Sequence, residues 1–188
     1  MIDEVLLILK DKLNEYVRIK TDHPEDKVVF PDGSKPDSSQ FALNNITAML
    51  INIEEEKMVR SADRFGGVVK NGLRTGVNPS IPVNLLVLFV ARFADYQQSM
   101  KFLSLIIKFF QRNRVLDHAN TPSLSPEIGK LTIELQALPL AEQNELWNSL
   151  RSAYQPSLLY KVSMLVFNDT ESIQVISDVN QVELDISI

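Results

Sequence analysis

The chain has 188 residues, of which 45% are hydrophobic and 23% charged, a composition typical of a globular protein. Its 24 acidic and 19 basic residues give a net charge of −5, which argues against nucleic acid or an anionic membrane as a general partner. Cysteine is absent, which excludes disulfides, thiol catalysis and cysteine-ligated metal centres.

Neither a secretory signal nor a membrane span is expected. The N-terminus, Met1-Ile2-Asp3-Glu4, is negatively charged where a secretory signal is positive. The most apolar stretch, 83–93, is about half the roughly 20 residues that a membrane helix needs, and Arg92 interrupts it. We therefore expect a soluble protein that is made in the cytoplasm and does not insert directly into a membrane.

The first part of the chain predicts a helix, a loop and a strand. Residues 2–19 repeat apolar side chains at helical spacing. The polar stretch 21–40 is expected to be a loop, interrupted by a short strand at 28–30. Branched apolar residues predict a strand over 46–54.

A glycine-rich segment follows at 65–76, where Asn71-Gly72 is typical of a hairpin turn. Gly67 and Gly72 have the spacing of half a phosphate-binding loop, but Leu73 and Arg74 follow where lysine and a hydroxyl residue are required. The segment is interpreted as a flexible hairpin. The alternative is a partner-binding loop whose cations meet an acidic surface, namely Arg60, Arg64, Lys70 and Arg74.

The second part alternates strands and helices. Residues 83–93 predict a buried strand, and 130–137 and 158–167 predict two more. The helix predicted over 95–112 has an apolar face wide enough to be covered on two sides. One cover is the sheet, and the other is either the N-terminal helix or a neighbouring subunit. A further helix is expected from Pro139 to about residue 153.

The C-terminus alternates strictly between apolar and polar residues over 182–188 and predicts a strand. Such a strand needs a sheet edge, either in its own domain or in another chain by β-augmentation. The fold predicted from these elements is α+β, a single domain with a mainly antiparallel sheet flanked by helices. Residues 1–170 form its core and 171–188 a C-terminal extension. The apolar face of the final strand is a candidate partner-binding site, formed by Val182, Leu184, Ile186 and Ile188.

The chemistry of an enzyme is not evident. The only histidines are His23 and His118, and no G-x-S-x-G motif is present. No spacing matches H-E-x-x-H or a calcium-binding loop, and no cofactor motif is complete. We therefore expect no catalytic residue, metal or cofactor, while a small hydrolase using Asp117-His118 is the alternative from another class. Trp147 and the aromatic residues of 95–112 are interpreted as core or, alternatively, as a subunit interface.

The order and spacing of several short segments point to one family. These are Asn78-Pro79, Phe109-Phe110-Gln111, Trp147 and Pro156-Ser157-x-x-Tyr160. Together they resemble the cap, or tail-terminator, proteins of phage-tail-like contractile injection systems.

This resemblance implies a tail-terminator-like fold and a structural role without catalytic residues. Such caps form a six-fold ring on the end of the inner tube and sheath farthest from the baseplate, where they fix particle length and hold sheath to tube. The implied partners are the chain itself as a homohexamer, the inner tube protein and the sheath protein. Assembly is expected in the bacterial cytoplasm, with release as part of an extracellular particle compatible with it. A sheath, baseplate or membrane adaptor of the same apparatus is the nearest alternative.

Overall fold

The chain groups into two compact units, which consist of Met1–Glu54 with Val83–Leu165 and of Glu55–Pro82 with Val166–Ile188. The structure, a computed structural model, describes residues 1–21, 24–34, 41–56, 68–70, 73–76, 81–167 and 174–176. The predicted boundary at residue 170 and the predicted C-terminal strand lie outside these residues, so both stay predictions.

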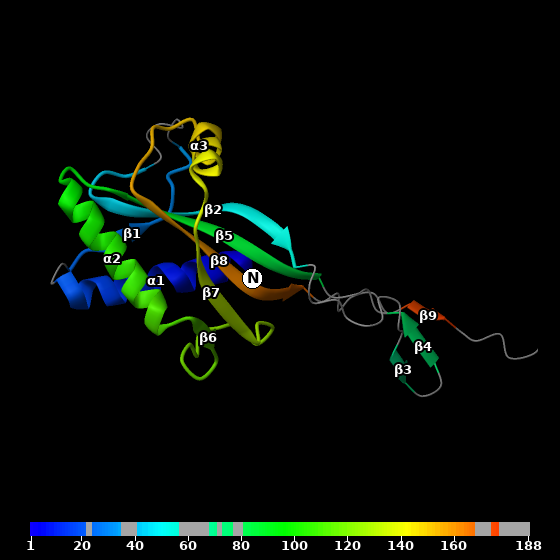
Figure 1. The fold of residues 1–188 in the computed structure, drawn as a ribbon. Coiled ribbons are helices and arrows are strands. Elements are labelled where there is room, and N and C mark those ends of the chain that lie inside the picture. Colours follow the sequence, from blue (N-terminus) through cyan, green and yellow to red (C-terminus); the bar gives the residue numbers. More distant parts are fainter. Residues whose placement is uncertain are drawn as a thin grey trace, which may run out of the picture. The chain divides into compact units, whose positions relative to one another are not determined.

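The first unit is built on a six-stranded sheet with the order β1-β2-β5-β8-β7-β6 (Figure 1). β1 and β2 pair in parallel, whereas β7 pairs antiparallel with both β6 and β8. The N–H of Glu56 donates to Pro82 and that of Ala91 to Pro156, which joins consecutive strand ends as antiparallel pairing requires. The predicted antiparallel α+β architecture is thus confirmed. The strands are β1 (Val28–Val29), β2 (Asn45–Glu55), β5 (Ile81–Arg92), β6 (Val115–Asp117), β7 (Lys130–Gln136) and β8 (Ser157–Phe167).

Three helices flank this sheet, as the sequence predicts: α1 (Ile2–Thr21), α2 (Tyr96–Arg112) and α3 (Leu140–Ser149). The Met1 ammonium lies 2.9 Å from Asp3 in the first turn of α1, and this hydrogen bond lowers the pKa of the Asp3 carboxyl. The start of α2 is capped by Asp95, whose carboxylate accepts the N–H of Gln97 at 2.9 Å.

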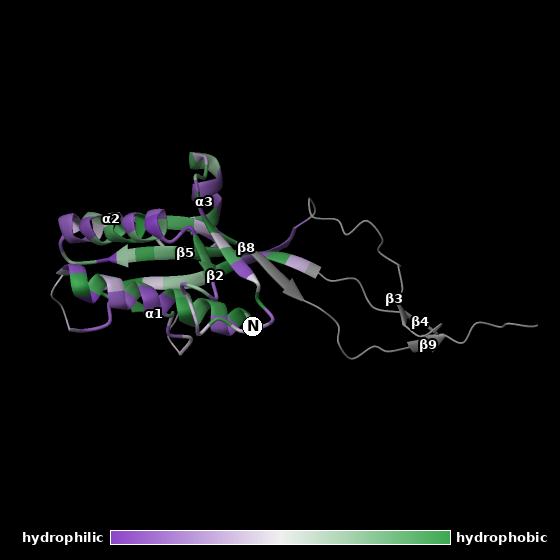
Figure 2. Cartoon of the chain, turned by 90° about the horizontal axis from the view of Figure 1, so that it is seen from below, coloured by the Kyte–Doolittle hydropathy of each residue, from purple (hydrophilic) through white to green (hydrophobic). Residues whose placement is uncertain are grey.

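The apolar face of α2 packs on one face of the sheet. The ring centroid of Phe110 lies 5.7 Å from that of Phe89 on β5 and 4.6 Å from that of Tyr160 on β8. The ring centroid of Phe109 also lies 5.4 Å from that of Tyr16 on α1, so the N-terminal helix covers part of α2. In Figure 2, β5 is almost entirely hydrophobic, whereas α1 and α2 show both colours, as expected for helices with one face in water.

The opposite face of the sheet is covered by α3. Leu88 and Val90 alternate with Phe89 along β5 and therefore point away from α2. They form a buried cluster with Trp147 of α3, together with Phe41 and Leu159. The predicted core position of Trp147 is confirmed, because its side chain is 4% exposed. A strand buried on both faces carries apolar residues on both sides, which explains why β5 is apolar at every position from Leu85 to Ala91.

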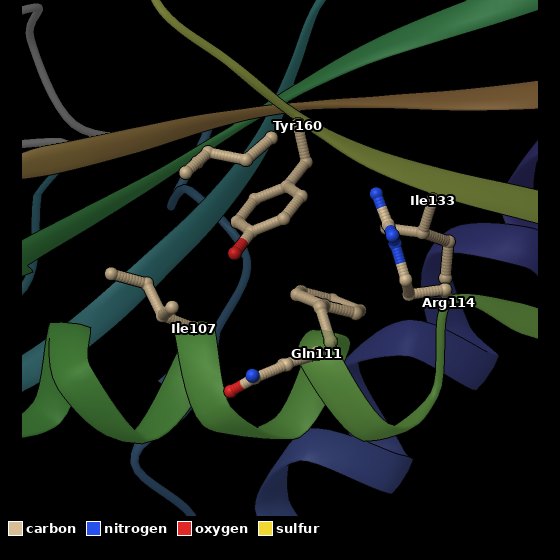
Figure 3. A pocket seen from close by; sticks show the side chains of 7 residues that line it. Ile107, Gln111, Arg114, Ile133 and Tyr160 are labelled. Atoms are coloured by element: carbon tan, nitrogen blue, oxygen red, sulfur yellow. The ribbon is translucent and has the colours of Figure 1, made fainter.

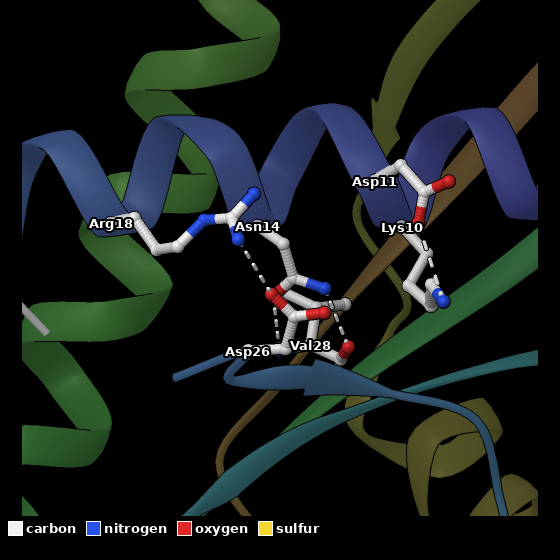
Figure 4. Close-up of polar contacts among 6 residues, drawn as sticks. All are labelled: Lys10, Asp11, Asn14, Arg18, Asp26 and Val28. Carbon is white, nitrogen blue, oxygen red and sulfur yellow. Dashed lines mark hydrogen bonds and ion pairs between the residues drawn. The ribbon is translucent and has the colours of Figure 1, made fainter. Parts of the chain in front are cut away.

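A buried polar residue joins α1 to the edge of the sheet (Figure 4). The Asn14 amide donates to the carbonyl of Val28 at 2.9 Å and accepts the Val28 N–H at 2.7 Å. The N–H and the C=O of Val28 therefore both have a hydrogen-bond partner in α1. Exposed ion pairs lie nearby on the same helix, including Arg18 with Asp26 at 3.4 Å. Such exposed pairs contribute little to stability.

The structure departs from the sequence predictions at several places. The helix α3 ends at Ser149 rather than near residue 153, because Arg151 adopts a left-handed φ of 50°. Tyr154 therefore lies beyond the helix, where it is 61% exposed. Tyr96, one of the aromatic residues of 95–112, is not part of the core, because at the start of α2 it is 67% exposed. The three-residue strand β6 was not predicted, because so short an element has no detectable periodicity.

The second unit contains a three-stranded sheet with the order β3-β4-β9, formed by Val68–Lys70, Leu73–Gly76 and Gln174–Ile176. Both neighbouring pairs are antiparallel. Lys70 pairs with Leu73, so two residues, Asn71 and Gly72, connect the strands. This confirms the predicted hairpin.

Candidate functional site

The residues predicted from sequence to bind partners fall only in part on the described chain. Lys70 lies in β3 and Arg74 in β4, where Arg74 pairs with Val69. The structure therefore places these two cations on one hairpin without setting them directly opposite each other. The other six candidates lie outside the described residues, namely Arg60, Arg64, Val182, Leu184, Ile186 and Ile188.

A basic recess that the sequence analysis missed lies where α1 and α2 end. It has a volume of about 380 Å³ and is lined by Lys20, Lys108 and Arg112, with Tyr16, Leu105 and Gln111. Within the described residues, these three cations form no ion pair. The Lys20 ammonium lies 5.9 Å from the centroid of the Tyr16 ring.

The helix ends explain some of these cations, because positive side chains stabilise the partly negative C-terminus of a helix. Lys108 lies a full turn before the end of α2, and α2 contains no acidic residue to balance it. The recess is therefore a local cationic surface on an acidic protein. The absence of Asp and Glu from 96–112 was the signal in the sequence, but only the fold brings Lys20 beside that helix.

An apolar recess of about 160 Å³ lies between α2 and the strands β7 and β8 (Figure 3). Phe110 and Tyr160 form its wall, and Arg114 and Gln111 are its polar residues. Burial raises the pKa of the Tyr160 hydroxyl to about 12. The hydroxyl therefore stays neutral at physiological pH, and the recess offers apolar contact rather than acid–base chemistry.

A second apolar recess of about 170 Å³ lies on the opposite face of the sheet, beside α3. It is lined mainly by leucines of β5, β7, β8 and α3, including Leu88, Leu146 and Leu159. Leu135 of β7 lines both recesses and is 51% exposed. The two recesses thus meet at the end of one strand.

Of the two residues in the hydrolase alternative, Asp117 has a structural role. The Asp117 carboxylate accepts the N–H groups of Ala119 and Asn120 at 3.0 and 3.1 Å and so stabilises a turn. His118 is exposed in that turn. His23 lies outside the described residues. Across the described ranges, no three His, Asp or Glu side chains gather as a metal ion would require. No helix in the same ranges has the length and hydropathy of a membrane span.

The sequence matches a known family, and the fold is similar to solved structures. Residues 4–180 match the family model of the Pvc16 N-terminal domain. One similar solved structure is the PVC sheath/tube terminator in its extended state, from an extracellular contractile injection system; it is 19% identical, with a TM-score of 0.59. Another is the tube-terminating cap of the anti-feeding prophage, at 17% identity and a TM-score of 0.55. The comparison with curated proteins gives no match.

The two structural alignments cover 100% and 94% of this chain, but only 65% and 59% of the respective terminator chains. At such low identity, the likeness establishes the fold and leaves the activity of the longer proteins to be tested. The family match is broader evidence, since it extends over nearly the whole sequence. By that match, the chain belongs to the Pvc16 N-terminal domain family.

Proposed function

We propose that this chain is a structural cap of a contractile injection system. In this role it terminates the inner tube and the sheath at the end distal to the baseplate, fixes their length and holds sheath to tube. The observation that carries the proposal is the match of its fold, over the whole chain, to a solved sheath/tube terminator. The family match over residues 4–180 supports the same role.

In this proposal the chain assembles as a homohexameric ring that contacts the inner tube protein and the sheath protein. The cap is assembled in the bacterial cytoplasm and becomes part of an extracellular particle. The role is non-enzymatic, and the turn that holds Asp117 and exposes His118 supports this interpretation. Heterologous contacts between two different patches are what close such a ring.

The experiment is to remove the chain from a producing strain and to measure sheathed tubes by negative-stain electron microscopy. We expect the uniform length, or the sheathed tubes themselves, to be lost and to return when the whole chain is supplied. The variant His118→Ala should restore them fully, whereas a hydrolase would lose its activity. Uniform, contractile particles without the chain would contradict the cap. A fixed length with randomly placed chain ends would instead favour an adaptor.

We further propose that cations of the chain contact acidic surfaces of the particle. The candidates are the basic recess at Lys20, Lys108 and Arg112 and the predicted loop residues Arg60, Arg64, Lys70 and Arg74. Complementary charge sets the specificity and speed of such contacts.

Lys108→Glu is expected to lower the retention of the chain on purified particles by about ten-fold, the effect of roughly 1.4 kcal/mol in a charged contact. The matched control is Lys101→Glu, which makes the same change in net charge at an exposed position of α2 that does not line the recess. Retention is measured by quantitative immunoblotting at low and high salt. Equal losses for the two variants would exclude a specific role for the recess.

A further inference from the structure

The sheet has an open edge at the end of β7. On its outer side, β7 pairs with the short strand β6 only over Lys130–Thr132. One more hydrogen bond follows, from the Ile133 N–H to the Arg114 carbonyl at 2.8 Å. Because outward groups alternate along a strand, the next outward N–H and C=O belong to Leu135. No backbone hydrogen bond among the described residues continues this ladder beyond Ile133.

The open edge lies between the two apolar recesses described above. Leu135 lines both of them, and Ile107 of α2, which is 39% exposed, lines the recess shown in Figure 3. A strand added beside Leu135 would place alternate side chains toward the two faces of the sheet. The edge therefore has free backbone groups for pairing and apolar surface for side chains, which are the two requirements of β-augmentation.

The chain itself contains a segment that fits this edge. Residues 182–188, Val-Glu-Leu-Asp-Ile-Ser-Ile, alternate four apolar side chains with two acids and a serine. Their apolar side would cover Ile107 and Leu135, where the recess also offers the wall formed by Phe110 and Tyr160.

A second open edge within the described part of the sheet, along β2, suits this segment less well. The outer side of β2 has a partner strand only at Ile46 and Thr47, so it too is available for pairing in the described structure. Its far end, however, carries the exposed acids Glu54 and Glu55. These would repel Glu183 and Asp185, since like charges on adjacent strands are destabilising. On the face of β7 that these acids would share, the acid Glu134 lies opposite Lys161 of β8, so a cation is beside it.

We propose that residues 182–188 of one copy add as a strand to the β7 edge of a second copy. The apolar residues Val182, Leu184, Ile186 and Ile188 then lie over the α2 side of the recess. Donor segment and acceptor edge are two different patches of one chain, so repeating this contact generates a head-to-tail ring. The inference rests on the self-association included in the proposed function and names its contact.

The absence of cysteine allows a direct test by disulfide cross-linking of the full-length protein. One tagged chain carries Leu135→Cys, and a second, differently tagged chain carries one cysteine at position 182, 183, 184, 185 or 186. After mixing and mild oxidation, we expect cross-linked pairs of the two tags for 182, 184 or 186. Cysteines at 183 and 185 should cross-link at least about five-fold less, because they point to the opposite face.

Equal yields at odd and even positions would overturn the pairing. Cross-links that form only within one chain, in a variant that carries both cysteines, would overturn the exchange between copies. Yields are read on non-reducing gels against the tag of each partner. Because this test uses purified protein, it stays distinct from the particle-length experiment. If the chains do not cross-link but the particles still have a uniform length, this contact is rejected and the proposed cap function still stands.

Two further variants probe the edge itself. Leu135→Lys places a charge on an exposed edge position, and Leu135→Pro removes an outward N–H without touching the ladder to β8. Each should shift the protein toward monomer in size-exclusion chromatography, as should deletion of Val182–Ile188. All three should retain the far-ultraviolet circular dichroism of a folded chain. A truncated chain that fails to fold would show that the segment is internal and would overturn the proposal. An edge variant that folds and still assembles as the wild type does would overturn it equally.

Discussion

Replacing Trp147 with alanine is expected to lower the free energy of unfolding by about 4 kcal/mol, as for other large aromatic residues truncated in a core. Trp147 is the only buried residue of α3 and packs against Phe41, Leu88, Val90 and Leu159. Its removal leaves a cavity under the helix that the surrounding side chains cannot fill. Urea denaturation followed by circular dichroism measures the loss, since the variant has no tryptophan to report it.

Two controls separate packing from other effects. Trp147→Phe should cost much less, about 1–2 kcal/mol, because it keeps an aromatic ring in the cluster. The indole N–H has no hydrogen-bond partner within the described residues, so no such bond is lost. Leu140→Ala, at 79% exposure on the same helix, should change stability by less than about 0.5 kcal/mol. Equal losses for Trp147→Ala and Leu140→Ala would show that α3 does not depend on this contact.

Replacing Asn14 with alanine is expected to cost about 3 kcal/mol, although it removes only a small side chain. The substitution leaves the N–H and the C=O of Val28 without their hydrogen bonds from Asn14 at a buried position. A buried group that loses its partner costs about 1–3 kcal/mol. The half-buried Asn45, whose amide donates to Leu43 in an exposed hydrogen bond, provides the control, and Asn45→Ala should be nearly neutral. Urea denaturation of both variants checks the difference.

The variant Asn14→Asp adds a pH dependence with a defined sign. Its carboxylate still accepts the Val28 N–H but has no proton to donate to the Val28 carbonyl. The protonated form can donate, so folding raises the pKa of this carboxyl above the roughly 3.9 of an unfolded chain. The folded state then binds more protons, and stability relative to wild type falls as pH rises from about 4 to 7. A deficit that shrinks over that range would contradict the role assigned to Asn14.

Local patterns in the sequence were sufficient for most of the elements. Helical spacing over 2–19 and 95–112 corresponds to α1 and α2, because burial of one face dictates a 3.6-residue period. The predominantly apolar stretch 83–93 corresponds to β5, which is buried on both faces. Asn71-Gly72 marked the turn between β3 and β4, since few residue pairs accept the backbone of a two-residue hairpin loop.

The interaction surfaces depended on contacts between segments that are distant in the chain. Lys20 and Lys108 share a recess only because α1 and α2 end side by side. The open edge at Leu135 exists because the pairing of β6 with β7 stops at Thr132. No residue pattern in the sequence predicts that stop. Asn14 looked like one polar position of a helix until Val28 was placed beside it.

The sequence by itself thus determined the elements and the family resemblance, because periodicity, turn chemistry and motif order are properties of neighbouring residues. Only the tertiary structure decided which edge is open, which cations converge and which buried polar groups pair. Those outcomes depend on strand order and helix docking, and the free energy that selects them is summed over contacts from the whole chain.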